Sequence, residues 1–478
     1  MCLKKRLQAI AEGQIEGTSS ELELPRAISD ETGLPNKGSK STARDFIEAR
    51  YATITTPCLP VGWNTECVLI DAMFWLHAPP KKGSTMAQHA LTLFQTKVFY
   101  YIQRGSSEVH IVFDMPMGFT NHPKSVEHKH RYSSGCPSDT HIQPYDEMKC
   151  PKDWSMLMQC QQCKHNLSSY IGNKLLNISP EYLNGNQKVY VAGCEIGGSS
   201  ERTLYTTCTG MLQPEPRLRC NALEADTRLW LHDAYCHPKN TLIISADTDV
   251  IFIGLTMQFP TNTVIIKTNV AGKPSKYLHM DKLQDAIHRD PDLASVPITI
   301  RAQVLQAVYA LSGCDFVSFF TGFGKVAFFK CLLQHSDFVT SQELPGDLSE
   351  NSASESGFQA FIRLVGCLYY TEHRRAFGNV ATPTGLFHQL EAQDSVIQHE
   401  EWLDTIRDEV WQRIYFENKL IPSLEALRRH YQRAMWVVNY WRQAATNVMD
   451  PLPPQCNGWK QTETGLEVEW DSEDNINK

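Results

Sequence analysis

Residues 222–255, ALEADTRLWLHDAYCHPKNTLIISADTDVIFIGL, decide the fold that we expect for this chain. The first part predicts a helix whose leucines face inward, with Arg228 and Asp233 directed toward solvent. The residues Thr241-Leu-Ile-Ile-Ser245 form a short apolar run, which is typical of a strand buried inside a parallel sheet. The stretch therefore predicts one helix–strand unit of an α/β protein.

Acidic residues stand at the start of the predicted helix and at the carboxyl end of the predicted strand. Glu224 and Asp226 stand at the expected helix start, and Asp247 and Asp249 follow the strand at its carboxyl end, where open parallel sheets bind ligands. No Lys or Arg lies within ISADTDV, so a cation must relieve the repulsion, and Mg2+ or Mn2+ prefers such oxygen ligands. A surface turn and an acid-capped helix are the alternative interpretation.

The same pattern occurs earlier in the chain. Cys67-Val-Leu-Ile70 predicts a strand that ends in Asp71, residues 84–104 predict a helix, and Val109-His-Ile-Val-Phe113 predicts a second strand followed by Asp114. A strand, a helix and a strand in this order predict a parallel sheet. We therefore expect an α/β fold with a central, mainly parallel sheet flanked by helices.

Basic residues follow Asp114 in the segment MPMGFTNHPKSVEHKHRY. Lys124 and Arg131 are seven residues apart, so a helix would place them on one face. Such a pair could hold a phosphate group, although a solvated charged helix would have the same composition.

Residues 132–200 are rich in cysteine and poorly periodic, so we expect an insertion between two halves of one sheet. Cys160-x-x-Cys163 suggests zinc, with Cys150 or Cys136 as a further ligand. Because no second matching pair follows, we expect ordinary reduced cysteines here and no zinc.

Two turns follow the central unit. The predicted helix 301–311 leads to Gly313, whose flexibility could direct Asp315 at the acids. Gly322 and Gly324 precede another apolar helix, where exposed backbone N–H groups could hold a phosphate, although a plain connecting turn fits equally well.

Composition bounds the remaining possibilities. The chain has 478 residues, 42% of them hydrophobic, and no run of apolar residues long enough to cross a membrane. The amino terminus shows no secretory signal, so we expect an intracellular protein with mostly reduced cysteines. Its net charge of −8 excludes a generally basic nucleic-acid binder and leaves local basic patches for that role.

The chain divides into four expected parts. We expect a mostly disordered segment over residues 1–50, the α/β domain over 51–340, a helical region over 341–447 and an extended acidic tail over 448–478.

Seven motifs in order resemble the flap endonuclease/XPG-type branch of the PIN-like nucleases. They are IDAMFWLH, IVFDMP, KSVEHKHR, LEADTR, ISADTDV, LSGCDF and TGFGK. The motifs EADTR, DTDV and GCD, together with the carboxyl-terminal ALRRHYQRAMWVVNYW and NGWK, are also similar to a family of animal proteins often associated with mobile elements, a resemblance that reaches about residue 460. The nuclease resemblance covers about residues 65–340.

This resemblance implies a role for each matching residue. The acids that would hold two Mg2+ or Mn2+ ions are Asp71, Asp114, Glu224, Asp226, Asp247, Asp249 and Asp315. Lys124 and Arg131 would hold the scissile phosphate, and Gly322, Gly324 and Lys325 would contact the nucleic-acid backbone. The sequence departs from the family by having Asp226 in place of Glu, by its region 132–200 and by an imperfect hairpin motif.

The resemblance implies metal-dependent cleavage of phosphodiester bonds in structured DNA. It favours DNA over RNA as the partner and the nucleus over the cytoplasm, and it implies no membrane. A PIN-like scaffold that binds nucleic acid or protein without cutting is the alternative, and a phosphatase with an aspartyl nucleophile is a third. The nuclease prediction requires that the acids converge and that no lysine or arginine replaces the metals among them.

Overall fold

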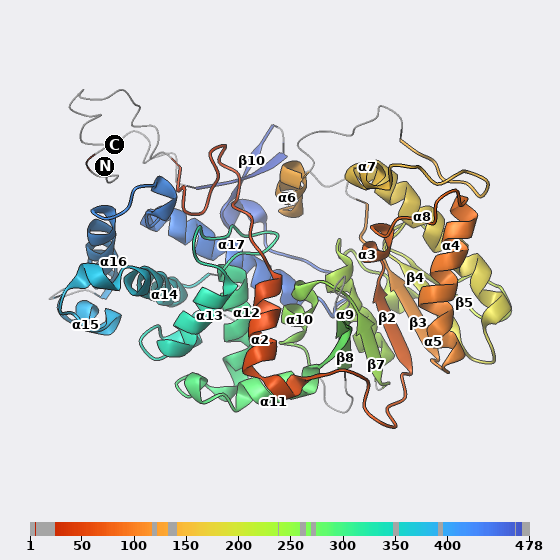
Figure 1. The fold of residues 1–478 in the computed structure, drawn as a ribbon, viewed down its shortest axis with the longest axis horizontal. Helices are drawn as coiled ribbons and strands as arrows, with labels where there is room; N and C mark the ends of the chain where they lie inside the picture. Colours follow the sequence, from red (N-terminus) through yellow and green to blue (C-terminus); the bar gives the residue numbers. More distant parts are fainter. Residues whose placement is uncertain are drawn as a thin grey trace.

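The computed structural model describes residues 5, 24–116, 122–131, 141–237, 239–258, 264–268, 274–347, 353–390, 395–463 and 465–470. Within these ranges, nine strands form one sheet in the order β1-β9-β8-β7-β2-β3-β4-β5-β6 (Figure 1). The central parallel strands are β8 Val264–Thr268, β7 Thr241–Ile244, β2 Cys67–Asp71, β3 Glu108–Val112 and β4 Lys188–Ala192. The antiparallel strands at the two edges are β1 Thr55–Thr56, β9 Lys276–His279, β5 Thr203–Thr206 and β6 Gln213–Pro214.

The path of the chain reverses at β2. The chain adds β3 and β4 on one side of β2 and then returns to add β7 and β8 on the other side. The carboxyl ends of neighbouring parallel strands meet at such a switch point, where open α/β sheets bind their ligands. The predicted α/β fold with a central, mainly parallel sheet is confirmed.

Hydrophobic side chains cover both faces of this sheet, because residues along a strand alternate between faces. Val68 and Ile70 pack on one face and Leu69 on the other. The first face lies under α4 Met86–Leu93, α5 Phe99–Gln103 and α8 Gln161–Ile178. The second face lies under α9 Ala225–Cys236, α10 Thr248–Gly254, α11 Met280–His288 and α12 Arg301–Leu311.

The expected insertion at residues 132–200 is in fact part of the sheet domain. In its described part, 141–200, α7 Trp154–Gln159 and α8 connect β3 to the parallel strand β4. Leu167 and Leu175 of α8 are fully buried in the core that contains Val68. The segment between the two halves of the sheet thus contributes to the core, which the sequence did not reveal because the polar residues of α8 hid its apolar face.

Residues 24–50 are ordered, contrary to the expected disorder of residues 1–50. They include α2 Ser41–Arg50, and Ile28 and Ile47 are buried. The Asn36 carbonyl accepts a hydrogen bond from the Phe319 N–H, which ties this segment to the turn after α12. Residues 1–23, apart from Lys5, lie outside the described residues.

The carboxyl-terminal region is packed on the same core. Its helices are α13 Lys325–Gln334, α14 Glu355–Glu372, α15 Pro383–His388, α16 Ser395–Trp411 and α17 Leu424–Arg442. A hairpin of β10 Trp459–Thr462 and β11 Gly465–Val468 follows, with Trp459 and Leu466 buried. The Trp470 indole N–H donates to the Gly33 carbonyl at 2.8 Å. The described residues after 448 therefore differ from the predicted extended tail, because Trp459, Leu466 and Trp470 are buried.

Among the described residues, every helix is too short or too polar to cross a membrane.

Candidate functional site

Carboxylates gather at the carboxyl edge of the sheet, beside the switch point. Asp71 ends β2, Asp114 lies two residues beyond β3, and Asp247 caps the helix that follows β7. They line a cleft of about 500 Å3. Asp71 accepts a 2.9 Å hydrogen bond from Ser245, and Asp114 accepts one of the same length from the Ala225 N–H.

The starts of two helices add three more acids. Glu224 caps α9, Asp226 lies in the first turn of α9, and Asp249 lies in the first turn of α10. All three side chains are buried. Carboxylates are favoured at helix starts because the helix dipole is positive there. One carboxylate oxygen of each of Asp226, Asp247 and Asp249 lies within 4.8 Å of the others.

Asp315 reaches the cluster from the turn after α12. Gly313 in this turn has a φ of +103°, and a Cβ there would lie 2.6 Å from the Phe319 ring. Only glycine fits this close approach, as the sequence suggested. The structure therefore brings all seven predicted acids to one place.

Lys124 also lies at the cluster, as predicted. It begins α6 Lys124–Arg131 and is buried. Its ammonium forms an ion pair with Glu224 and lies 3.1 Å from Asp315 Oδ2. Arg131 ends the same helix, and its side chain lies outside the described residues.

Lys40 is a second cation at the cluster, and the sequence did not predict it. Its ammonium lies 2.7 Å from Asp249 Oδ2, 3.1 Å from Asp315 Oδ1 and 3.2 Å from Asp247 Oδ1. A lysine therefore does lie among the acids, so the condition that the nuclease prediction set is not met by this arrangement, and the prediction now requires that a divalent cation displace Lys40. Lys40 could not be found from sequence because it lies more than 200 residues from its partners in a polar segment.

The electrostatics of the cluster combine burial with mutual repulsion. Burial, together with repulsion from Asp114, raises the pKa of Asp71 to about 7. Burial raises the pKa of Glu224 to about 7 even though Lys124 opposes this. Burial and Glu224 raise the pKa of Asp226 well above its ordinary value. Two ammonium groups thus compensate the negative charge of these acids only in part.

The pKa values of the two lysines are raised as well, which favours their charged form. Burial disfavours the charge of Lys40, but Asp247, Asp249 and Asp315 raise its pKa well above the ordinary value. Glu224 and Asp315 do the same for Lys124. Both lysines are therefore positively charged at neutral pH.

The donor set fits a divalent cation. The three clustered carboxylates offer hard oxygen ligands, which Mg2+ and Mn2+ prefer. Within the described residues, the buried Glu224 Oε2 has no hydrogen-bond partner. Such an orphaned oxygen is expected where an ion completes the site. Buried acidic and His/Cys clusters that could bind a metal are present, and the acidic one is the predicted one.

The turn of Gly322, Gly324 and Lys325, which was predicted to contact a nucleic-acid backbone, makes internal contacts instead. Lys325 is fully buried, and its ammonium donates to the backbone carbonyls of Tyr309 and Gly313. It therefore closes the end of α12 and cannot contact a phosphate backbone. Gly322 has a φ of +89°, and Gly324 caps α13, so both are explained by the turn itself.

Tyr309 is a further contributor that the sequence did not reveal. Its hydroxyl donates to Asp249 Oδ1, and its ring stacks on Phe252 at 3.7 Å between centroids. The sequence predicted the helix over 301–311 but gave no sign of this hydrogen bond.

Arg228 and Asp233 of α9 are buried, although they were expected to face solvent. Arg228 donates to the carbonyls of Glu201 and Leu218, which lie in the irregular segment beside the helix. These carbonyl acceptors make its burial possible.

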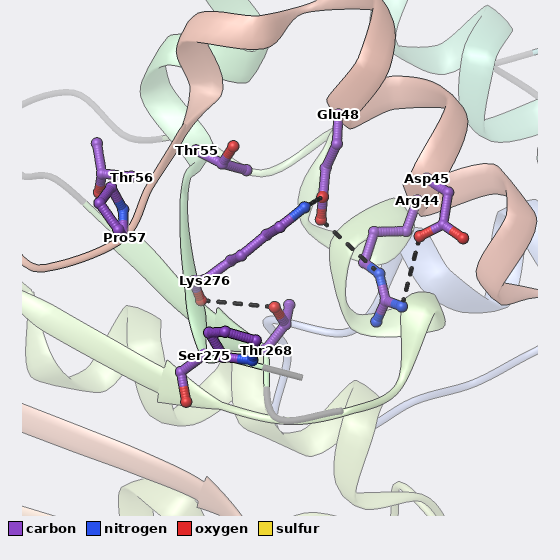
Figure 2. A pocket seen from close by; sticks show the side chains of 10 residues that line it. Arg44, Asp45, Glu48, Thr55, Thr56, Pro57, Thr268, Ser275 and Lys276 are labelled. Carbon is purple, nitrogen blue, oxygen red and sulfur yellow. Dashed lines mark hydrogen bonds and ion pairs between the residues drawn. The ribbon is translucent and has the colours of Figure 1, made fainter. Parts of the chain in front are cut away.

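Two other features lie apart from the acids. His141, Cys160 and Cys163 gather within 4.8 Å, and Cys150 is not among them. A separate cavity of about 380 Å3 lies between α2 and β9, where Glu48 pairs with Arg44 and Lys276 (Figure 2).

No protein-family model and no curated protein sequence matches this chain.

Proposed function

We propose that this chain is a Mg2+- or Mn2+-dependent phosphodiesterase that cleaves structured DNA, of the flap endonuclease/XPG-type PIN-like kind. The observation that supports the proposal is the convergence of seven acids on the switch point of a parallel sheet. They come from positions spread between Asp71 and Asp315, and a purely structural sheet edge has no need of them.

The acids would bind the metal ions, and the lysines would interact with the negative charge of the substrate. Asp226, Asp247 and Asp249 would hold one ion, and Asp71, Asp114, Glu224 and Asp315 would complete a second site. When bound, such ions activate water and stabilise the leaving oxygen. Lys124 lines the cleft and could contact a substrate phosphate once Glu224 turns to a metal.

A metal at the first site must displace Lys40, because both use oxygens of Asp247 and Asp249. The released ammonium would remain at the rim of the cleft on the segment before α2. There it could face the negative charge of a bound nucleic acid.

A non-catalytic scaffold is the second candidate, and the position of Lys40 favours it. If Lys40 and Lys124 are permanent counter-ions, the cluster is an internal salt-bridge network and the cleft binds a partner without cutting. The two candidates differ in whether a divalent cation can replace Lys40.

Cleavage assays distinguish them. Labelled single-stranded, flapped and hairpin DNA would be incubated with the chain in Mg2+, in Mn2+ or in a chelator. We expect cleavage only with metal, and a loss of at least about 100-fold in Asp249→Asn. Asp285→Asn is the matched control, because that carboxylate is exposed and lies on α11.

A folded wild-type chain that shows neither cleavage nor metal-dependent stabilisation would support the scaffold instead. Binding of the same DNA without cleavage would identify nucleic acid as its partner.

A further inference from the structure

A second set of metal-binding side chains lies at the amino edge of the sheet, opposite the acids. Cys67 begins β2, Glu108 begins β3 as its register partner, His110 follows on β3, and Cys236 ends α9. All four residues are buried. Since α9 starts at the acids and ends here, the helix rise puts the two sites about 15 Å apart.

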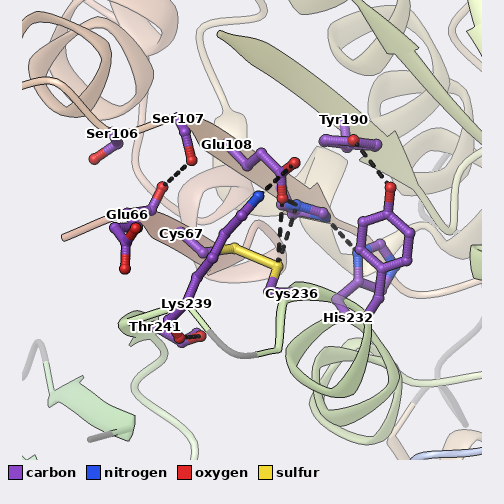
Figure 3. Close-up of a disulfide and its surroundings, with 12 residues drawn as sticks. Glu66, Cys67, Ser106, Ser107, Glu108, Tyr190, His232, Cys236, Lys239 and Thr241 are labelled. Carbon is purple, nitrogen blue, oxygen red and sulfur yellow. Dashed lines mark hydrogen bonds and ion pairs between the residues drawn. A yellow bond between two sulfur atoms is a disulfide. The ribbon is translucent and has the colours of Figure 1, made fainter. Parts of the chain in front are cut away.

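The structure joins Cys67 and Cys236 by a disulfide, with Glu108 and Lys239 beside it (Figure 3). One ligand atom from each of Cys67, Glu108, His110 and Cys236 lies within 4.8 Å of all the others. A disulfide needs only its two sulfurs. The burial of an imidazole and a carboxylate against them indicates a further role.

The separations of His110, Glu108 and Cys236 match three corners of a tetrahedral zinc site, and reduction of the disulfide would free the Cys67 sulfur to take the fourth. His110 Nε2 lies 3.6 Å from both Glu108 Oε2 and Cys236 Sγ, and Cys236 Sγ lies 3.7 Å from Glu108 Oε2. Zinc bond lengths to sulfur, nitrogen and oxygen imply ligand separations of roughly 3.3–3.8 Å in a tetrahedron. The three measured separations fall in that range.

Neighbouring side chains hold two of these ligands in place. His110 Nδ1 lies 2.9 Å from His232 Nδ1, which leaves Nε2 directed at the cluster. The His110 ring stacks on Tyr190 at 4.1 Å between centroids. Lys239 lies 2.8 Å from Glu108 Oε1, which leaves Oε2 for the cluster. Zinc-binding histidines and carboxylates are typically oriented by such partners.

We propose that Cys67, Glu108, His110 and Cys236 bind one Zn2+ when the disulfide is reduced. A thiol reductant gives two electrons to the S–S bond, which yields two cysteine thiols and the oxidised reductant. Zinc then binds the two sulfurs, and the two thiol protons pass to solvent. The charges of two thiolates and one carboxylate are balanced by Zn2+ and Lys239. Oxidation of the thiolates by a disulfide compound would reverse these steps and release the ion.

Alkylation of the full chain provides a test that needs no variant. The chain would be reduced with a phosphine, freed of metal and treated with iodoacetamide, with or without Zn2+, and each cysteine would be followed by mass spectrometry. We expect Zn2+ to slow alkylation of Cys67 and Cys236 by at least about tenfold. The buried Cys194, which belongs to neither His/Cys cluster, is the internal control.

Zinc content of variants locates the ion. We expect the reduced Cys67→Ser/Cys236→Ser chain to bind one Zn2+ fewer than the wild type. We expect Cys160→Ser/Cys163→Ser to keep that ion, because those residues belong to the other His/Cys cluster. With Co2+ in place of Zn2+, we expect the visible absorption of a tetrahedral thiolate complex at this site in the wild type. We expect Cys67→Ser/Cys236→Ser to lack that absorption.

Three results would overturn the proposal. They are unchanged alkylation of Cys67 and Cys236 in Zn2+, equal zinc content in the wild type and Cys67→Ser/Cys236→Ser, and a reduced chain that Zn2+ neither binds nor stabilises. A folded Cys67→Ser/Cys236→Ser chain, checked by circular dichroism, keeps the second comparison valid. The assay does not depend on DNA cleavage, so its failure is separate from failure of the proposed function.

Discussion

The ammonium of Lys40 lies 2.7 Å from Asp249 Oδ2, across 209 positions of sequence. The segment that carries Lys40 is held to the turn after α12 by backbone hydrogen bonds, and α2 packs against α10 and α13. Any divalent ion at Asp226, Asp247 and Asp249 competes with this ammonium for the same oxygens. Metal binding and the position of the amino-terminal segment should therefore be linked.

Replacing Lys40 with Met should lower the stability of the metal-free protein and increase the stabilisation that a divalent metal provides. Without metal we expect a loss of about 2 kcal/mol in the free energy of unfolding, because charged hydrogen bonds contribute on this scale. In Mg2+ or Mn2+ we expect a larger gain in stability than the wild type shows, since the ion no longer displaces an ammonium. Urea unfolding across a metal titration measures both.

Lys37→Met is the control, since Lys37 is exposed on the same segment. If Lys40→Met shows the same metal-dependent gain as the wild type, competition between the ion and Lys40 is excluded.

Tyr309→Phe should weaken the support of Asp249 without changing the packing of α12. The substitution keeps the stacked ring and removes the hydroxyl that donates to Asp249 Oδ1. We expect a loss of about 1.5–3 kcal/mol in metal-free stability, the usual range for a hydrogen bond to a charged group. Thermal unfolding in a chelator measures it, and a change below about 0.5 kcal/mol would show that the bond contributes little.

The sequence predicts the sheet and its acids because their signals are local. Asp71 and Asp247 each follow a short apolar strand, and parallel strands bring their carboxyl ends to one edge. Glu224 and Asp249 stand at helix starts, where acids are expected in any case. Asp315 was joined to them by Gly313, which could turn the chain toward the acids, and by the resemblance to a known order of motifs.

The remaining features depend on contacts between distant segments. Lys40 lies in a polar segment without helical periodicity, and its position depends on acids far along the chain. Lys325 follows two glycines at a helix start, a pattern that suits either phosphate binding or an internal bond to carbonyls. Arg228 was misjudged because its carbonyl partners lie in an irregular segment that no periodicity describes.

Arg228→Lys should destabilise the fold by about 3 kcal/mol, because a buried guanidinium that bonds several carbonyls would be replaced by a group that reaches fewer. Arg217→Lys is the matched control, since the Arg217 side chain is 73% exposed. Urea unfolding of both variants at pH 7.5 measures the difference. Equal losses in the two variants would contradict a structural role for Arg228.

Asp233→Asn should stabilise the protein increasingly as the pH rises. Burial raises the pKa of Asp233 from 3.8 to about 6, and a hydrogen bond with Thr241 opposes this only in part. Among the described residues, Asp233 Oδ1 has no hydrogen-bond partner. The folded state therefore holds the proton more tightly than the unfolded state between about pH 4 and pH 6.

The contribution of Asp233 to the unfolding free energy of the wild type must consequently fall as the pH rises through this window, because the folded state then holds a buried carboxylate in its ionised form. A difference of about two pKa units corresponds to about 3 kcal/mol. Asparagine cannot ionise, so its variant lacks this fall, while the other buried acids affect both proteins equally. We expect urea unfolding at pH 4, 5, 6 and 7 to show a gap that widens in favour of Asp233→Asn and levels off above pH 7. Parallel stability curves for the two proteins would mean that Asp233 titrates alike in the folded and unfolded states.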